Sequence, residues 1–274
     1  MPESTFAELP WQPIYDALNV VVPAIEDRPL ASYVEEFSAT MADTTAIQYF
    51  DRSISYAELN AEANQLANAL VSLGVEKSDV VGLHLVNIPQ YVVALLAVSK
   101  IGCAGSGVSP LMSPSELAYQ IEDANISVLI SLDDLVDSTL QRLNNPPACL
   151  NHVISCSASD HLQPQPAAAK QLAELQCHNY LDLIAQFPAD FAQRPVSGDD
   201  TMMVQYTGGT TGRPKGAELS VRNLMYNPLQ YSAYQPWEIG SEIVITGFPM
   251  FHAAGLAFVI ATLRHGGQFA LIPN

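Results

Sequence analysis

The residues best suited to chemistry lie between Thr207 and Gly216, in the order Thr-Gly-Gly-Thr-Thr-Gly-Arg-Pro-Lys-Gly. Glycine allows backbone angles that other residues resist and lets a ligand approach the chain closely. Successive amide N–H groups in such a turn form an anion-binding concavity, to which threonine hydroxyls add donors. The lysine adds a point charge suited to phosphate oxygens. The segment therefore predicts a phosphate-binding loop.

The flanking residues indicate how this loop is mounted. The apolar run Thr201–Tyr206 predicts a strand, and Ser220 is typical of the N-cap of a helix. We expect that helix to begin at Val221 and to stop near Pro228. A strand, a glycine-rich loop and a helix are a usual mounting for phosphate groups. The segment is not a Walker motif, because proline precedes the lysine and glycine follows it.

This stretch resembles the phosphate loop of the adenylate-forming superfamily, which comprises acyl-CoA synthetases, luciferases and peptide-synthetase adenylation domains. Glycine at 208, where many members carry serine, is most similar to the fatty acyl-CoA synthetase branch. Further segments resemble the family in the expected order, so the resemblance covers roughly residues 30 to 274. They are Ser53–Leu59 with Tyr-x-x-Leu, Leu95–Gly102 with Lys-x-Gly, Ser113–Tyr119, and Phe248–Gly255 with Pro-x-Phe-His-x-x-Gly.

The resemblance implies a reaction and a set of ligand-binding residues. A carboxylate attacks the α-phosphate of ATP, pyrophosphate leaves with Mg2+, and the thiol of coenzyme A then displaces AMP from the acyl-adenylate. Fixed donors and cations must neutralise the negative charges that meet in this reaction. The residues that the resemblance assigns to the ATP phosphates are Thr207, Gly208, Gly209, Thr210, Thr211, Gly212 and Lys215.

His252 is the second residue to which the resemblance gives a role. A lone histidine after phenylalanine is more often a satisfied core residue, but this one stands in the Pro-x-Phe-His-x-x-Gly motif. In the family, this histidine borders the place where the acyl carboxylate meets the α-phosphate. Ala253, Ala254 and Gly255 would leave room for an acyl chain. The apolar run that continues to Leu263 either lines a tunnel or forms an ordinary buried helix.

One departure from the family pattern lies next to the phosphate loop. The family usually reads Ser/Thr-His-x-Asn after Lys-Gly, whereas this chain has Ser220-Val221-Arg222-Asn223. Valine removes an imidazole at this place, which puts the local hydrogen bonding in doubt.

Strand-like and helix-like runs alternate along the chain, as in an α/β fold whose sheets are flanked by helices. Residues 46–50 and 53–55 predict a hairpin around Asp51-Arg52. Helices are expected at Tyr56–Leu73, Gln90–Ile101 and Pro114–Asp123, strands at Val80–Leu85, Cys103–Val108 and Ser127–Ser131, and connectors at residues 157–170 and 187–200.

By resemblance, the chain is the N-terminal large domain of the acyl-adenylate-forming fold. Residues 15–75 and 235–274 would form one unfinished α/β subdomain, and residues 76–234 the second, which carries the phosphate loop. The family's Tyr-Gly-x-Thr-Glu motif, its ribose-binding aspartate and its small C-terminal domain with the catalytic lysine do not occur in the sequence. We therefore expect a truncated large domain that is inactive by itself.

The composition of the chain limits the classes of partner that it can bind. With 28 acidic and 11 basic residues the net charge is −17, which repels nucleic acid and anionic membranes. The N-terminus lacks the basic and apolar regions of a signal peptide, and the longest apolar stretch is well short of the ~20 residues that span a bilayer. Four cysteines without a C-x-x-C pair indicate reduced thiols, with Cys103 in the core. We expect a cytoplasmic protein without a firm metal site of its own.

The sequence favours an ATP-dependent acyl-CoA synthetase for medium- or long-chain fatty acids, with the acid, ATP and coenzyme A as partners. An amino-acid or acyl-AMP ligase of the same superfamily is the first alternative, against which glycine at 208 argues mildly. A non-catalytic nucleotide-binding fragment is the second, supported by the missing motifs. The acyl chain length and a homodimer are left open.

Overall fold

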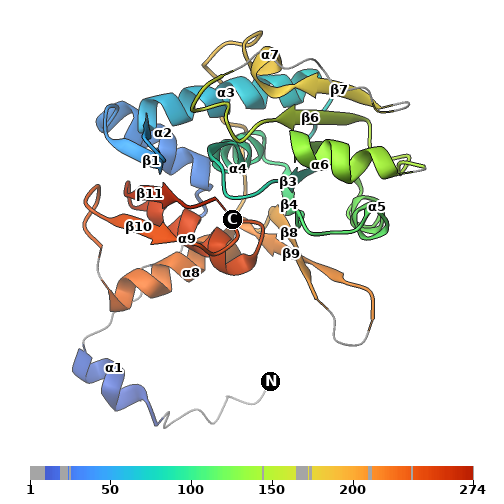
Figure 1. Cartoon of the computed structure of the whole chain (residues 1–274). Helices are drawn as coiled ribbons and strands as arrows, with labels where there is room; N and C mark the ends of the chain where they lie inside the picture. Colours follow the sequence, from blue (N-terminus) through green and yellow to red (C-terminus); the bar gives the residue numbers. More distant parts are fainter. Residues whose placement is uncertain are drawn as a thin grey trace.

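The computed structural model describes residues 10–18, 24, 26–143, 145–164, 172, 175–208, 212–235 and 237–273. These residues form two sheets and the helices that flank them (Figure 1).

The larger sheet has seven strands in the order β7-β6-β5-β3-β4-β8-β9. Its strands are β3 (Val80–His84), β4 (Ala104–Gly107), β5 (Ile126–Leu132), β6 (His152–Cys156), β7 (Gln176–Asn179), β8 (Thr201–Thr207) and β9 (Lys215–Ser220). Neighbours from β7 to β8 are parallel, and β9 runs antiparallel to β8 at the edge. Because the carboxyl ends of parallel strands meet at one edge of a sheet, the segments that follow β3, β4 and β8 are brought together there.

The smaller sheet has four strands in the order β10-β11-β1-β2. They are β1 (Thr45–Tyr49), β2 (Arg52–Ser55), β10 (Ile243–Thr246) and β11 (Gln268–Leu271). β11 lies parallel to both β10 and β1, whereas β1 and β2 form an antiparallel hairpin. The sheet thus joins the early part of the chain to its last strands.

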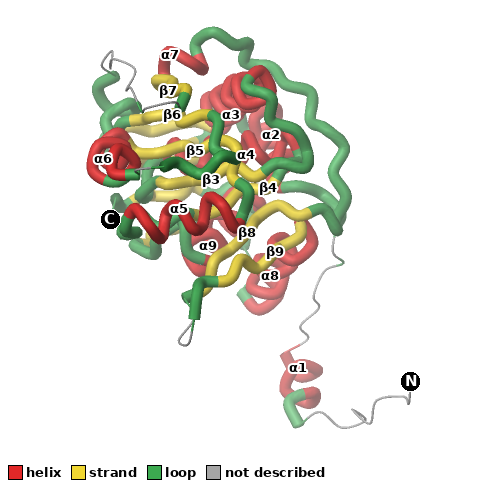
Figure 2. Tube along the Cα trace, turned by 90° about the vertical axis from the view of Figure 1, so that its right-hand side faces the viewer, coloured by secondary structure: helices red, strands yellow, loops and turns green. Residues whose placement is uncertain are grey.

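Helices cover both faces of the seven-stranded sheet (Figure 2). The helices are α1 (Gln12–Leu18), α2 (Leu30–Thr40), α3 (Tyr56–Ser72), α4 (Pro89–Ile101), α5 (Pro114–Asp123), α6 (Asp133–Ser138), α7 (Tyr180–Ile184), α8 (Val221–Tyr234) and α9 (Ala253–Arg264), with a 3₁₀ turn at Leu140–Arg142. One apolar cluster joins α2, α3 and α4 to one face, and a second joins α5 and α6 to the other. Successive residues of β5 alternate between them, Val128 and Ile130 in the first cluster and Leu129 in the second.

Local sequence accounts for most of these elements. Every residue of α4 is buried, which confirms that this helix, apolar on nearly all sides, lies between layers. α3 and α5 each begin with a capping box, Ser55 with Glu58 and Ser113 with Glu116. α3 ends before Gly74, whose φ of 90° suits glycine.

The expected strands and helices up to β5 are confirmed, with shifts of at most one residue at their ends. The turn of the β1–β2 hairpin is corrected. Arg52 pairs with Tyr49, so the turn is made by Phe50 and Asp51, and Phe50 takes a φ of 51° to close it. Residues 187–200 form the expected connector, and residues 157–164 are a loop, whereas 165–170 lie outside the described residues.

The division of the chain into two subdomains stays a prediction. None of the helices in the described ranges has the length and hydropathy needed to cross a bilayer. All four cysteines are free thiols, and Cys103 is buried in the core as expected.

Candidate active site

The phosphate-loop segment connects two strands of a hairpin. β8 ends at Thr207 and β9 begins at Lys215, with Tyr206 opposite Gly216 and Thr207 opposite Lys215. The strand before the loop is therefore confirmed, but the helix does not follow the loop directly. Gly216 lets β9 lie close to β8, because a Cβ atom there would stand 2.8 Å from the Val204 side chain. In Figure 1 this hairpin extends away from the body of the molecule.

The helix after β9 begins where the sequence predicts and ends later. Ser220 caps α8 by a capping box with Asn223. Val221, the residue that replaces the family's histidine, is buried in the core. The predicted stop at Pro228 is wrong, because the helix continues through this proline to Tyr234. Pro228 and the following Leu229 are buried, and this packing offsets the lost backbone hydrogen bond.

Most of the described residues of the loop are open to solvent. Thr207, Gly208, Gly212 and Lys215 are exposed. A Cβ atom at either of the two glycines would meet no other atom within 4 Å. Gly209, Thr210 and Thr211, which the sequence also assigns to the ATP phosphates, lie outside the described residues. Their predicted roles stay predictions, as do those of the four exposed residues.

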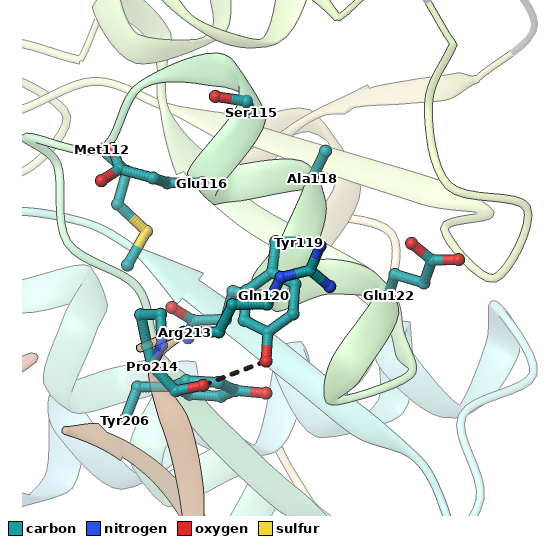
Figure 3. Close-up of a pocket in the computed structure, with 10 residues that line it drawn as sticks. All are labelled: Met112, Ser115, Glu116, Ala118, Tyr119, Gln120, Glu122, Tyr206, Arg213 and Pro214. Carbon is teal, nitrogen blue, oxygen red and sulfur yellow. Dashed lines mark hydrogen bonds between the residues drawn. The ribbon is translucent and has the colours of Figure 1, made fainter. Parts of the chain in front are cut away.

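Helix α5 contacts the hairpin at its loop end, where β8 and β9 meet the phosphate loop (Figure 3). The Tyr119 hydroxyl donates to the carbonyl oxygen of Pro214 at 3.0 Å, and the Tyr206 hydroxyl donates to Asp123 Oδ2. The guanidinium of Arg213 lies 5.4 Å from the centre of the Tyr119 ring. Burial and the hydrogen bond to Asp123 raise the pKa of Tyr206, so this hydroxyl keeps its proton at neutral pH. These contacts border a depression of about 510 Å³ between α5 and the hairpin.

His252 is the N-cap of α9. Its Nδ1 accepts a hydrogen bond from the backbone N–H of Ala254 at 3.4 Å, and the side chain is exposed. Because Nδ1 serves as the acceptor, the neutral ring carries its proton on Nε2. The nitrogen that remains available for a ligand is therefore a donor.

Two buried amides hold the turn before His252. Asn87, in the loop after β3, donates to the carbonyl oxygens of Phe248 at 3.1 Å and Ile272 at 3.2 Å, and accepts from the N–H of Met250 at 2.9 Å. Gln205, two residues before the end of β8, donates to the carbonyl oxygen of Phe251 at 3.0 Å.

The small residues after His252 differ in their surroundings. Ala253 is exposed and Ala254 is half-buried. Gly255 is buried, and a Cβ atom there would lie 2.2 Å from the carbonyl oxygen of Pro249. Glycine at 255 is thus required by backbone packing within the turn. An acyl pocket beside these residues stays a prediction, to which Ala253 and Ala254 are the more accessible contributors.

The structure brings the two predicted centres together. Gln205 lies on the strand that leads to Thr207, and its side chain bonds the residue that precedes His252. Sequence reasoning did not identify Asn87, Gln205, Tyr119 or Asp123. The position of Asn87, a polar residue between the buried strand β3 and the buried helix α4, could have indicated its role. No local sequence pattern distinguishes Gln205 from other polar residues of a strand.

The described part of the chain has no cluster of side chains typical of a metal site. No group of three or more His, Cys, Asp or Glu side chains that could hold a metal ion occurs there.

Curated relatives and solved structures resemble this chain over most of its length. The long-chain-fatty-acid–CoA ligase of Bacillus subtilis (strain 168) is 28% identical over 266 residues, which are 91% of this chain and 47% of that protein. The crotonobetaine/carnitine–CoA ligase of Salmonella heidelberg (strain SL476) is 29% identical over 224 residues, 80% of this chain and 41% of that protein. The chain thus spans about half the length of the curated relatives it matches.

Two solved structures show the same fold. An anthranilate CoA ligase in complex with anthranoyl-AMP superposes with a TM-score of 0.77 at 23% identity, over 92% of this chain and 46% of that one. A long-chain-fatty-acid-CoA ligase from Archaeoglobus fulgidus gives a TM-score of 0.76 at 20% identity, over 91% and 47%. The fold is that of the N-terminal part of adenylate-forming enzymes. The family model of the AMP-binding enzymes matches residues 34–274, and the chain belongs to this family.

Proposed function

We propose that the protein carrying this chain is an ATP-dependent acyl-CoA synthetase that activates a fatty acid as its acyl-adenylate and transfers it to coenzyme A. The observation that carries this proposal is the bond from Gln205 to Phe251. It joins the strand of the phosphate loop to the turn of His252, so that the groups for the phosphates and for the carboxylate share one edge of the sheet.

The phosphate-loop hairpin binds the anionic end of ATP. The Thr207 hydroxyl, the loop amides and the Lys215 ammonium group are donors, and the described ones are exposed at the end of β8 and start of β9. They stabilise the negative charge that moves onto pyrophosphate as the bond between the α- and β-phosphates breaks.

His252 lies where the substrate carboxylate meets the α-phosphate of ATP. Its Nε2–H, left free by the Ala254 contact, donates to a carboxylate or phosphate oxygen. A carboxylate oxygen attacks the α-phosphorus, pyrophosphate leaves, and the acyl-adenylate forms. The thiol of coenzyme A, after losing its proton, then attacks the acyl carbon and AMP leaves.

Mg2+ accompanies the ATP phosphates when it is bound and neutralises part of their charge. Among the described residues, no group of three or more His, Cys, Asp or Glu side chains could hold it.

The fatty acid is the substrate class favoured by the long-chain relatives and by the small residues beside His252. The crotonobetaine/carnitine relatives support a second candidate, a synthetase for a short polar carboxylic acid. The two candidates differ in the length of acid that the site accepts.

Acid-dependent exchange of pyrophosphate into ATP tests the proposal, measured on the protein carrying this chain with acids from two to eighteen carbons. We expect exchange to be fastest with medium or long chains, and preference for short polar acids would favour the second candidate. Exchange that depends only on amino acids would refute both. The 274-residue chain alone should form no acyl-CoA.

A further inference from the structure

We propose that Asn87 and Gln205 are positioning residues that fix His252 relative to the phosphate-loop strand. The proposal rests on the proposed function, because it gives the two amides a part in the adenylation step. Neither side chain touches the exposed ring of His252 in the structure. Both act on the backbone that carries it.

Asn87 joins the two sheets at the candidate site. It follows β3 of the seven-stranded sheet and is 1% exposed. Its three hydrogen bonds reach Phe248 and Met250, which follow β10, and Ile272, which follows β11 of the four-stranded sheet. The donors and the acceptor of one amide thus hold the segments that follow β10 and β11 of the smaller sheet against the larger sheet.

Gln205 holds the other end of the same turn. It is 7% exposed and bonds the carbonyl oxygen of Phe251, which directly precedes His252. Gly107, at the end of β4, allows this approach, because a Cβ atom there would stand 2.6 Å from the Phe251 carbonyl oxygen. The turn therefore lies on β4 and is bonded to β8.

These contacts determine where the ring of His252 lies. The turn is bonded at Phe248, Met250 and Phe251, and His252 then caps α9. Thr207 follows Gln205 on the same strand, so a shift of the turn would change the distance between the phosphate donors and the imidazole. Displacement of a reacting group by about 1 Å can cost on the order of a hundredfold in rate.

The first experiment is nuclear magnetic resonance of the histidine rings in the 274-residue chain, with the His252 signal assigned through His252→Gln. We expect Gln205→Met to move the Cδ2 signal of His252, which reports the protonated ring nitrogen, more than those of the other five histidines. Gln193→Met is the matched control, because Gln193 also donates to backbone carbonyls, those of Ser99 and Lys100. It should leave the His252 signal in place.

An unchanged His252 signal in Gln205→Met, or an equal shift of all histidines, overturns the proposal. Circular dichroism establishes that each variant is folded. Should Gln205→Met fail to fold, Asn87→Asp gives the same readout, because it keeps the acceptor for Met250 and removes both donors.

The second experiment measures pyrophosphate exchange in the protein carrying this chain. We expect Gln205→Met to lower kcat about tenfold while the KM for ATP stays within about twofold, as for a lost transition-state alignment. A moved His252 signal with an unchanged kcat overturns the positioning role and leaves the proposed function standing. A wild-type protein without acid-dependent exchange refutes the proposed function instead, whereas the ring signals still decide whether the amides hold His252.

Discussion

The hairpin of the phosphate loop and the turn of His252 lie at one edge of the seven-stranded sheet but are built in opposite ways. Thr207, Gly208, Gly212 and Lys215 are exposed, and the two glycines have empty surroundings. The turn is held by two buried amides and by glycines in direct backbone contact. Within the described residues, α5 contacts the hairpin at Tyr206 and Pro214, on either side of the loop.

Glycine therefore occurs in the two regions for different structural reasons. At 208 and 212 a side chain would find space, so no packing contact requires glycine there, and the role predicted for these two glycines is to let a ligand approach the chain closely. At 107 and 255 a side chain would strike backbone atoms, so glycine there serves packing. Substitutions in the hairpin should therefore affect activity, and those in the turn should affect stability as well.

Lys215→Ala should have the largest effect on activity, and none on stability. Removal of one charged donor from a phosphate site costs on the order of 10²- to 10³-fold in rate. We expect this loss in pyrophosphate exchange by the protein carrying this chain, with the urea midpoint of unfolding unchanged. Lys77→Ala is the matched control, because Lys77 is an exposed lysine paired with Asp200 on a different edge of the sheet. Normal exchange in Lys215→Ala would remove this lysine from the site.

Two glycine substitutions compare the regions directly by stability. Gly255→Ala should lower the free energy of unfolding by about 3 kcal/mol, because its Cβ must displace the Pro249 carbonyl. Gly208→Ala meets nothing within 4 Å and should change it by less than about 0.5 kcal/mol. Urea unfolding of the 274-residue chain measures both values. Equal losses would show that the two regions are not built differently.

The outcome for Gly255 shows where sequence reasoning reaches its limit. A glycine directly after an alanine pair predicts open space as readily as close packing, and the backbone of Phe248 and Pro249 decides between them. Capping boxes such as Ser113 with Glu116 are predictable, because both partners lie within one helical turn.

Contacts between distant segments explain what was missed. β9 reads Lys-Gly-Ala-Glu-Leu-Ser, a polar run without the alternation of a strand, and its pairing with β8 makes it one. The bond from Gln205 to Phe251 likewise depends on a fold that brings β8 to the turn. The two candidate centres were predictable from motifs, whereas the side chains that join them were not.

A fall in pH should lower the free energy of unfolding through His84, which is buried in the core. Burial lowers the pKa of His84, at the end of β3, to about 4 from the ordinary 6.5. The unfolded chain therefore binds the proton more tightly, and stability falls as the pH drops through 6.5 toward 4. From pH 7 to 5 this contributes about 2 kcal/mol. His84→Gln keeps a partner for Ser131 but does not titrate, so its unfolding free energy should fall less over that range. Parallel pH profiles for the two proteins would contradict this assignment.

The contact between α5 and the hairpin should give the smallest effect. Tyr119→Phe removes the hydrogen bond to Pro214, whose net contribution is about 1 kcal/mol. Trypsin cleavage after Lys215 reports release of the hairpin, because the Arg213–Pro214 bond resists this protease. We expect Tyr119→Phe to increase the cleavage rate about fivefold, which corresponds to that energy when opening is fast relative to cleavage. Tyr226→Phe, an exposed tyrosine on α8, is the control and should leave the rate unchanged. A Tyr119→Phe chain cleaved at the wild-type rate would mean that α5 borders the hairpin without restraining it. The open and fixed regions would then differ even more than their hydrogen bonds indicate.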